Sequence, residues 1–218
     1  MNAILHTLVI SLALCLCTPS KAQTFAFGGS AVPASLTLSF GDGSSATIEA
    51  ATQGWWSATQ ANFNGNTNIV TGHMFDIQWN DFFVFDLTGR AGTVLSAGIG
   101  LNTGIVAGSP AFSLWDVSTS LTALLNLDTA PSAEIYTDLG SGVAYTDSRI
   151  AITTGHTDIE IALDSAAIAA IEAALGGRFA IGGSANIDIP EPSSALLLVS
   201  VTVAGYLRRQ ASKRSALS

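Results

Sequence analysis

The chain has 218 residues, of which 48% are hydrophobic and 11% charged, with 16 acidic residues against 8 basic ones. This composition excludes a long disordered chain, because disorder requires low hydrophobicity and high net charge. Residues 23–190 hold 15 of the acidic and three of the basic residues and so carry about −12. A segment of this charge repels phosphate, so nucleic acid is excluded as a partner.

The N-terminus contains an apolar run of about ten residues, LVISLALCLC, at positions 8–17. It is too short to cross a bilayer, which needs about 20 helical residues. Ser20 and Ala22 place small side chains at the −3 and −1 positions of a cleavage site, so residues 1–22 are predicted to be a secretory signal peptide cut after Ala22. The alternative is a buried N-terminal helix of a cytosolic domain. Cys15 and Cys17 are the only cysteines, so the exported domain is predicted to lack disulfides and cysteine metal sites.

Residues 23–188 are predicted to form one all-β domain. Short runs of alternating apolar and polar residues are bounded there by Gly, Asn, Asp and Ser. Strands are predicted at residues 36–40, 47–51, 74–79, 82–87, 94–101, 111–117, 150–153, 159–163 and 178–181. Asp42-Gly43 has the composition of a two-residue hairpin turn. Many short strands without βαβ alternation favour a β-sandwich or jelly-roll-like fold.

One helix is predicted near the end of this domain, in the sequence DSAAIAAIEAALGG at 164–177. Asp164 or Ser165 is expected to cap its start, and Gly176-Gly177 to end it. Its apolar face consists of Ile168, Ile171 and Leu175. We expect this short helix to cover one end of the sandwich, and a shorter helical turn to form over residues 121–125.

The C-terminal end has three parts in a fixed order. Pro190 and Pro192 flank Glu191 and interrupt any regular structure leaving the domain. An uncharged apolar stretch at 193–207 follows and is predicted to be a membrane helix. A basic tail at 208–214 is predicted to hold the far edge of that helix on the cytoplasmic side. The charges that stop the helix there are Arg208, Arg209, Lys213 and Arg214.

This arrangement over residues 189–214 resembles the PEP-CTERM sorting signal of Gram-negative bacteria, with Pro190, Glu191 and Pro192 as its motif. The resemblance implies recognition by an exosortase, a membrane-embedded cysteine protease or transpeptidase that cleaves near the motif. It further implies export by the general secretion machinery, a transient stay in the inner membrane, and delivery to the cell surface or extracellular matrix. Such proteins accompany extracellular polysaccharide and biofilm. The alternative is a plain single-span anchor, for which a stretch of about 15 residues is short.

A second resemblance covers roughly residues 75–185. Its residues are FFVFDLTG (82–89), SLWDVST (113–119), YTDLGSGVAY (136–145), IEIALDSAAIAAIEAALGG (159–177) and RFAIGG (178–183). This series looks like an ectodomain that recurs among PEP-CTERM proteins. The strand pattern of that ectodomain is similar to carbohydrate-binding-module-like sandwiches. The resemblance implies a fold and a location and assigns no catalytic residues and no ligand.

Trp55 and Trp56 are the candidate sugar-stacking residues. Adjacent residues on a strand face opposite ways, so one ring is predicted to lie in the core and the other to be exposed or on a rim. Trp79 and Trp115 alternate with apolar residues and are predicted to be core residues.

Metal binding has little support in the sequence. His73 and His156 each follow Thr-Gly and have Asp76 or Asp158 nearby, but no HxH or HExxH pattern joins them, which favours surface or turn histidines. Calcium stays an open alternative, because carboxylates in glycine-rich loops suit a hard cation. The loop carboxylates in question are Asp42, Asp138 and Asp147, and none has the DxDxDG spacing. We therefore predict no cofactor.

Catalysis has no motif either. No GxSxG elbow is present. Glycoside hydrolysis would need two carboxylates across a sugar, for which the candidates are Asp76, Asp81, Asp86, Asp116, Glu134 and Asp138. The number of these carboxylates does not show that any two of them face each other across a sugar-binding cleft. The prediction is a non-catalytic exported surface or matrix protein; the alternatives are a carbohydrate-binding module for exopolysaccharide and, third, a polysaccharide hydrolase.

Overall fold

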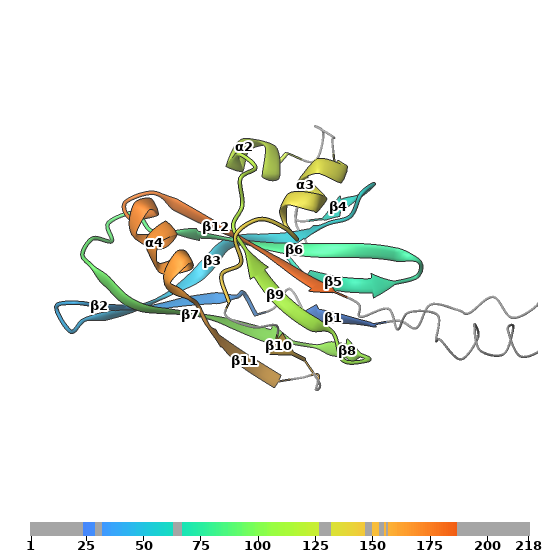
Figure 1. Ribbon diagram of the computed structural model, residues 1–218, viewed down its shortest axis with the longest axis horizontal. Helices are drawn as coiled ribbons and strands as arrows, with labels where there is room; N and C mark the ends of the chain where they lie inside the picture. Colours follow the sequence, from blue (N-terminus) through green and yellow to red (C-terminus); the bar gives the residue numbers. More distant parts are fainter. Residues whose placement is uncertain are drawn as a thin grey trace, which may run out of the picture. The chain divides into compact units, whose positions relative to one another are not determined.

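The computed structural model describes residues 24–28, 32–62, 67–126, 132–146, 150–152, 155 and 157–186 (Figure 1). The predicted signal peptide with its Ala22 cut site, the Pro190-Glu191-Pro192 motif, the membrane helix and the basic tail all lie outside these residues. Among the residues that are described, no helix is long and apolar enough to cross a membrane.

The described chain is mainly β, which confirms the predicted all-β class. Its strands are β1 (Thr24–Gly28), β2 (Ser35–Phe40), β3 (Ser45–Trp56), β4 (Ala61–Asn62), β5 (Ile69–Met74), β6 (Ile77–Asp86), β7 (Val94–Thr103), β8 (Ile105–Ala107), β9 (Ala111–Trp115), β10 (Ile150–Ala151), β11 (Thr157–Ala162) and β12 (Arg178–Asn186). Three short helices accompany them: α2 (Leu121–Leu124), α3 (Ser132–Asp138) and α4 (Ser165–Ala174).

The strands pair antiparallel in the order β10-β9-β12-β6-β3-β2-β7-β11, and β1 lies between β5 and β8. β3 is the strand that joins the two halves of this order. Its first part, from Ser45 to Glu49, pairs with β2, and the part from Ala50 to Trp56 pairs with β6. The register shifts between Ala50 and Thr52, where β3 changes partner.

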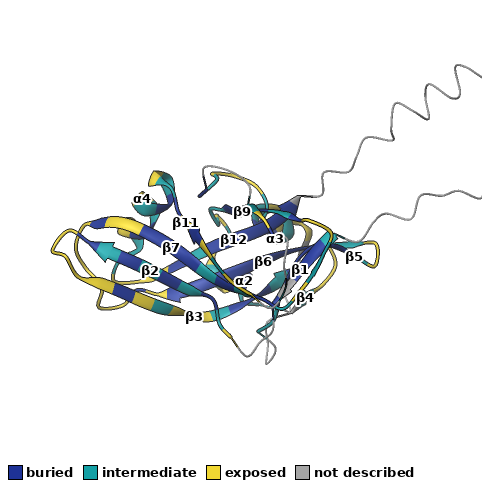
Figure 2. Cartoon of the chain, turned by 90° about the horizontal axis from the view of Figure 1, so that it is seen from below, coloured by how far each residue is buried: buried dark blue, intermediate teal, exposed yellow. Residues whose placement is uncertain are grey.

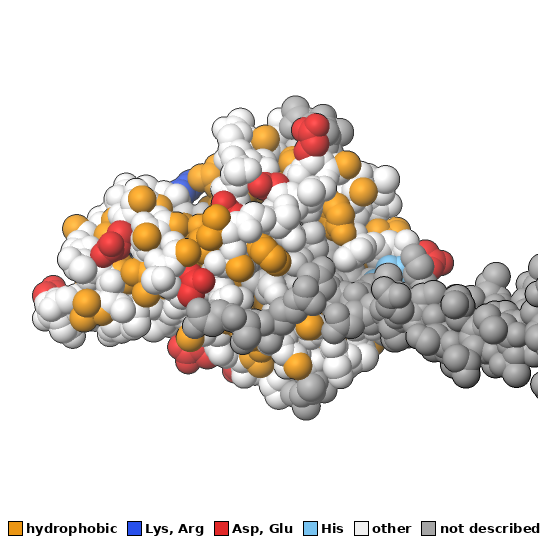
Figure 3. All heavy atoms as spheres, in the orientation of Figure 1, with side chains coloured by type: hydrophobic (Ala, Val, Ile, Leu, Met, Phe, Trp, Pro, Cys, Tyr) orange, Lys and Arg blue, Asp and Glu red, His pale blue; other side chains and the backbone are white. Residues whose placement is uncertain are grey.

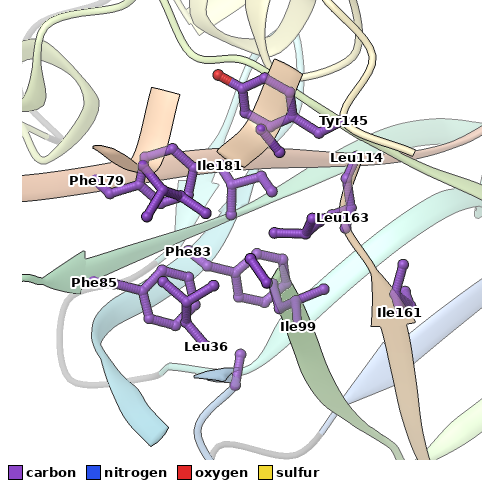
Figure 4. Close-up of a cluster of buried hydrophobic side chains, with 14 of the residues drawn as sticks. Leu36, Phe83, Phe85, Ile99, Leu114, Tyr145, Ile161, Leu163, Phe179 and Ile181 are labelled. Atoms are coloured by element: carbon purple, nitrogen blue, oxygen red, sulfur yellow. The ribbon is translucent and has the colours of Figure 1, made fainter. Parts of the chain in front are cut away.

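The main core gathers side chains from both halves of the strand order (Figure 4). Along β2 the burial alternates with the period of two expected of a strand with one face in the core, and Leu36 and Leu38 are fully buried. These residues and Ile99 of β7 belong to the same cluster as Phe83 and Ile181. The alternation seen in the sequence therefore identified the inward face correctly.

β6 is buried on both faces, as Figure 2 shows along its length. Phe83 and Phe85 enter the main core, while Phe82 and Val84 enter a second cluster with Trp56 and with side chains of α2 and α3. A strand covered on both sides needs apolar residues at consecutive positions, which explains the uninterrupted run FFVF at 82–85. The second cluster has no counterpart in the sequence analysis, because α3 was not predicted.

α4 matches its prediction closely. The Asp164 side chain accepts a hydrogen bond from the Ala167 amide at 2.9 Å and caps the start, and Gly176 follows the last turn with φ +81°. Ile171 is fully buried in the main core, and the helix packs against β7 and β12. The Glu172 carboxylate also accepts a hydrogen bond from the Val94 amide at 2.8 Å, which ties α4 to the start of β7.

The predicted strand at 74–79 is wrong. β5 ends at Met74 and β6 begins at Ile77, with a two-residue turn at Phe75 and Asp76, whose φ angles are +52° and +60°. Positive φ at both central residues matches the hairpin turn usually built from Asn-Gly or Asp-Gly. Phe-Asp is not typical of such a turn, so the sequence pattern predicted one continuous strand over residues 74–79.

The turn at Asp42-Gly43 is longer than predicted. Gly43 has the expected positive φ, +84°, but β2 ends at Phe40 and β3 begins at Ser45. The Asp42 carboxylate accepts hydrogen bonds from the Ser44 amide, at 2.9 Å, and from the Ser44 hydroxyl. These bonds stabilise the longer connection.

Candidate functional site

The two candidate stacking tryptophans lie on opposite faces of β3, as predicted from their adjacency. Trp56 is 1% exposed and packs in the second cluster, so its ring has no face open to solvent. Trp55 is partly buried and packs edge to face on Trp79, with 6.1 Å between ring centroids. Sugar stacking therefore stays a prediction for Trp55 alone.

The other two tryptophans divide between core and rim. Trp79 is buried, as predicted. Trp115 is only partly buried, and its indole N–H donates to the Ser184 hydroxyl at 2.8 Å. That hydrogen bond lies between neighbouring strands β9 and β12, so Trp115 contributes to sheet pairing.

An open groove of about 390 Å³ lies on the outer face of β2, β3, β7 and β11. Strand register places Glu49 beside Ser35, Ser35 beside Gly100, and Gly100 beside Glu160, in one row across the four strands. The groove is lined by Val32, Pro33, Ser35, Thr47, Glu49, Gly100, Leu101, Asn102 and Asp158. The middle of this row is made of small residues and its ends are carboxylates.

The groove offers hydrogen-bonding groups for a polar ligand. The Asn102 amide donates to the Asp158 carboxylate at 2.6 Å, leaving the second carboxylate oxygen and the amide oxygen available. The two carboxylates that line the groove, Glu49 and Asp158, come from β3 and β11, which are three strand spacings apart, about 14 Å. This spacing suits an extended ligand that runs across the four strands.

A second, shallower hollow lies beside α3. Glu134 and Asp138 of α3 both line it, together with residues of the 118–119 loop. Burial raises the pKa of Asp138, but hydrogen bonds from the side chain and amide of Ser118 and the amide of Thr119 outweigh burial and lower it. The Asp138 carboxylate thus ties the loop to α3, and both of its oxygens already accept hydrogen bonds from the protein.

The carboxylates considered for glycoside hydrolysis do not gather at one place. Asp76 is at the exposed β5–β6 turn, and Asp86 is exposed and accepts a hydrogen bond from the Thr88 amide. Asp116 accepts a hydrogen bond from the Val143 amide at 2.6 Å. Of the six, Glu134 and Asp138 line the same hollow in the described part of the chain. Figure 3 likewise shows acidic side chains at several separate places on the visible face.

His73 is not the surface or turn residue that was expected. It lies in β5 between Thr24 of β1 and Gln78 of β6, and is 5% exposed. Gly72 before it has φ +99°, and a side chain there would collide with the Thr24 carbonyl and the Phe25 backbone. The Thr-Gly-His pattern therefore marks a close approach of β1 to β5.

Among the residues that the structure describes, no group of three His, Cys, Asp or Glu side chains is arranged to hold a metal ion. His156 and Asp147, two of the residues considered for a metal, lie outside the described residues.

Asp81 is the residue whose environment the sequence analysis missed. It lies on the inward face of β6, opposite Trp55 and Gly183, and is 1% exposed. Burial raises the pKa of its carboxyl well above the ordinary value of 3.8. The available signal was its spacing, because Asp81 is two residues before the core residue Phe83 and therefore shares its face.

Comparison with known proteins adds no relative: no family model, no curated protein and no solved structure matches this chain. The site features that bear on function are thus the polar groove, the hollow beside α3 and the buried Asp81.

Proposed function

We propose that this chain is an exported surface or extracellular-matrix protein, without catalytic activity, that an exosortase processes at its C-terminal tail. The observation that carries the proposal is the order of features in the tail: Pro190-Glu191-Pro192, the apolar stretch 193–207 and the basic residues 208–214, with a signal peptide at 1–22. A protein of this design passes through the inner membrane and ends at the cell surface, in association with exopolysaccharide or biofilm.

A β-sandwich ectodomain suits this location. The described strands are all antiparallel, and side chains from β2 and β7 share one core with those from β6 and β12. We propose that the two halves of the strand order form the two layers of a sandwich, with α4 covering one end. The acidic surface would keep such a domain soluble and away from anionic lipid headgroups.

The test is intact-mass analysis of the protein recovered from the outer surface of its host. The expected mass lacks residues 1–22 and about 25 C-terminal residues, and Glu191→Ala abolishes the C-terminal cut. Asp188→Ala is the matched control, because it removes an acidic side chain three residues before Glu191, outside the motif. An uncut C-terminus in the unaltered protein would reduce the tail to an ordinary anchor.

A second candidate function is binding of the host's own exopolysaccharide. The groove on β2, β3, β7 and β11 favours it, since the carboxylates, amide and hydroxyls that line it match the hydroxyl groups of an extended sugar chain. Recognition there would depend on hydrogen bonds, because no aromatic side chain lines the described groove.

A further inference from the structure

Two buried polar side chains, each with an unpartnered oxygen among the described residues, line one small cavity. Asp81 of β6 and Thr71 of β5 are 1% and 2% exposed, and both line a cavity of about 10 Å³. Among the described residues, neither the Thr71 hydroxyl nor the Asp81 Oδ1 has a hydrogen-bond partner. Buried polar groups of native proteins are nearly always paired. Two unpaired oxygens beside the same cavity therefore indicate that the cavity holds a hydrogen-bonding ligand.

The cavity limits what that ligand can be. About 10 to 15 Å³ of such space is what a single water molecule requires, and it excludes a sugar or any larger ligand. Its other walls are uncharged and include Ala26 of β1, Ile69 of β5 and Phe112 of β9. Asn102 and Thr103 also line it, but their side chains hydrogen-bond to Asp158 and Thr157.

We infer that one internal water molecule occupies this cavity and links the Thr71 hydroxyl to the Asp81 carboxyl. Burial keeps the Asp81 carboxyl protonated over a wider pH range than an exposed one, so it can donate one hydrogen bond and accept others. The water joins β5 to β6 beyond the last pair of their backbone register, which is Gly72 with Trp79. Ala26 and Gly28 of β1 form part of the cavity wall.

A double-mutant cycle in the full chain tests this link. Thr71→Val and Asp81→Leu each remove one partner of the water and leave the other buried and unpaired, so each is expected to weaken the folding equilibrium roughly tenfold. The double variant replaces both partners by apolar groups of similar shape and releases the water, so it is expected to recover most of that loss. If the effects of the two single variants simply add in the double variant, the inference is wrong.

Thr103→Val is the matched control. Thr103 lines the same cavity, but its hydroxyl already donates to the Thr157 carbonyl at 2.9 Å. Its effect should therefore add to that of Asp81→Leu without coupling. If Thr103→Val coupled to Asp81→Leu as strongly as Thr71→Val does, the coupling would reflect any change in the cavity wall. The proposed link between Thr71 and Asp81 through one water molecule would then be wrong.

A direct measurement covers the case in which Asp81→Leu does not fold. In the full chain, a nuclear Overhauser effect is expected between the Thr71 methyl protons and a long-lived water molecule. Its absence from the unaltered chain would refute the inference whatever the variants do.

Discussion

Asp81 of β6 lies directly opposite Gly183 of β12, and the Asp81 carboxyl together with the Phe112 ring takes the space that a side chain at position 183 would need. The glycine therefore makes room for an acidic side chain in the interior. This relationship explains why a carboxyl can be accommodated among core residues without distorting the sheet. Burial at this place also raises the pKa of the Asp81 carboxyl well above its ordinary value.

The first prediction concerns pH and the free energy of unfolding. The folded chain keeps the Asp81 proton at pH values where the unfolded chain has lost it, because burial raises the folded pKa above 3.8. This contribution to stability is complete below about pH 3.8, falls as pH rises toward the folded pKa, and is lost above it. Within that window one proton accounts for about 1.4 kcal/mol per pH unit. Urea unfolding at a series of pH values measures the free energy of unfolding, and Asp81→Asn should remove its fall with rising pH.

Asp86→Asn on the same strand is the control. Hydrogen bonds from the Thr88 side chain and amide lower the pKa of the exposed Asp86 carboxyl. Its contribution therefore has the opposite sign, present above the ordinary pKa and lost as pH falls. If Asp86→Asn flattened the loss of stability with rising pH as Asp81→Asn does, the assignment to Asp81 would fail.

The second prediction concerns the β5–β6 turn. Phe75 has φ +52° and a side chain that is 71% exposed, so it gains little from burial while adopting a backbone that L-residues avoid. Phe75→Asn should raise the free energy of unfolding by about 1 kcal/mol, because asparagine tolerates this conformation. Thermal unfolding measures it. Leu95→Asn, at a 63% exposed strand position, should bring no such gain. A loss of stability at position 75 would show that the Phe75 ring has a packing role.

The third prediction concerns the start of α4. Asp164→Ala removes the side chain that accepts from the Ala167 amide, and should cost about 1 kcal/mol in the free energy of unfolding. Asp164→Asn, which keeps an acceptor, should restore most of it. Ser165→Ala is the neighbouring control, since the serine side chain is not the cap. Equal losses at both positions would contradict the assignment.

The fourth prediction tests the groove as a sugar site. Glu49→Gln and Asp158→Asn keep the shape of two exposed side chains that line the groove and remove their charges, so stability should change little. Binding of the host's exopolysaccharide should weaken about tenfold for each, because hydrogen bonds to charged groups are the stronger ones. Titration calorimetry measures both constants, with Glu134→Gln at the other hollow as the control. Unchanged binding in both groove variants, or no binding by the unaltered chain, would remove the carbohydrate function.

The sequence by itself determined features that depend on neighbouring residues. Strand alternation, the cap and glycine stop of α4, and the opposite faces of Trp55 and Trp56 all follow from local backbone geometry. The turn at Phe75-Asp76 was not predicted, because its conformation is imposed by the pairing of β5 with β6 and not by its own residues.

Only the tertiary structure decided the sites. The groove depends on Ser35 lying between Glu49 and Gly100, and the last of these is more than sixty residues away in the chain. Asp81 became a buried acid because β12 supplies Gly183 opposite it and β1 contributes to the wall of the cavity beside it. Register between distant strands sets which side chains meet, and no local pattern encodes that register.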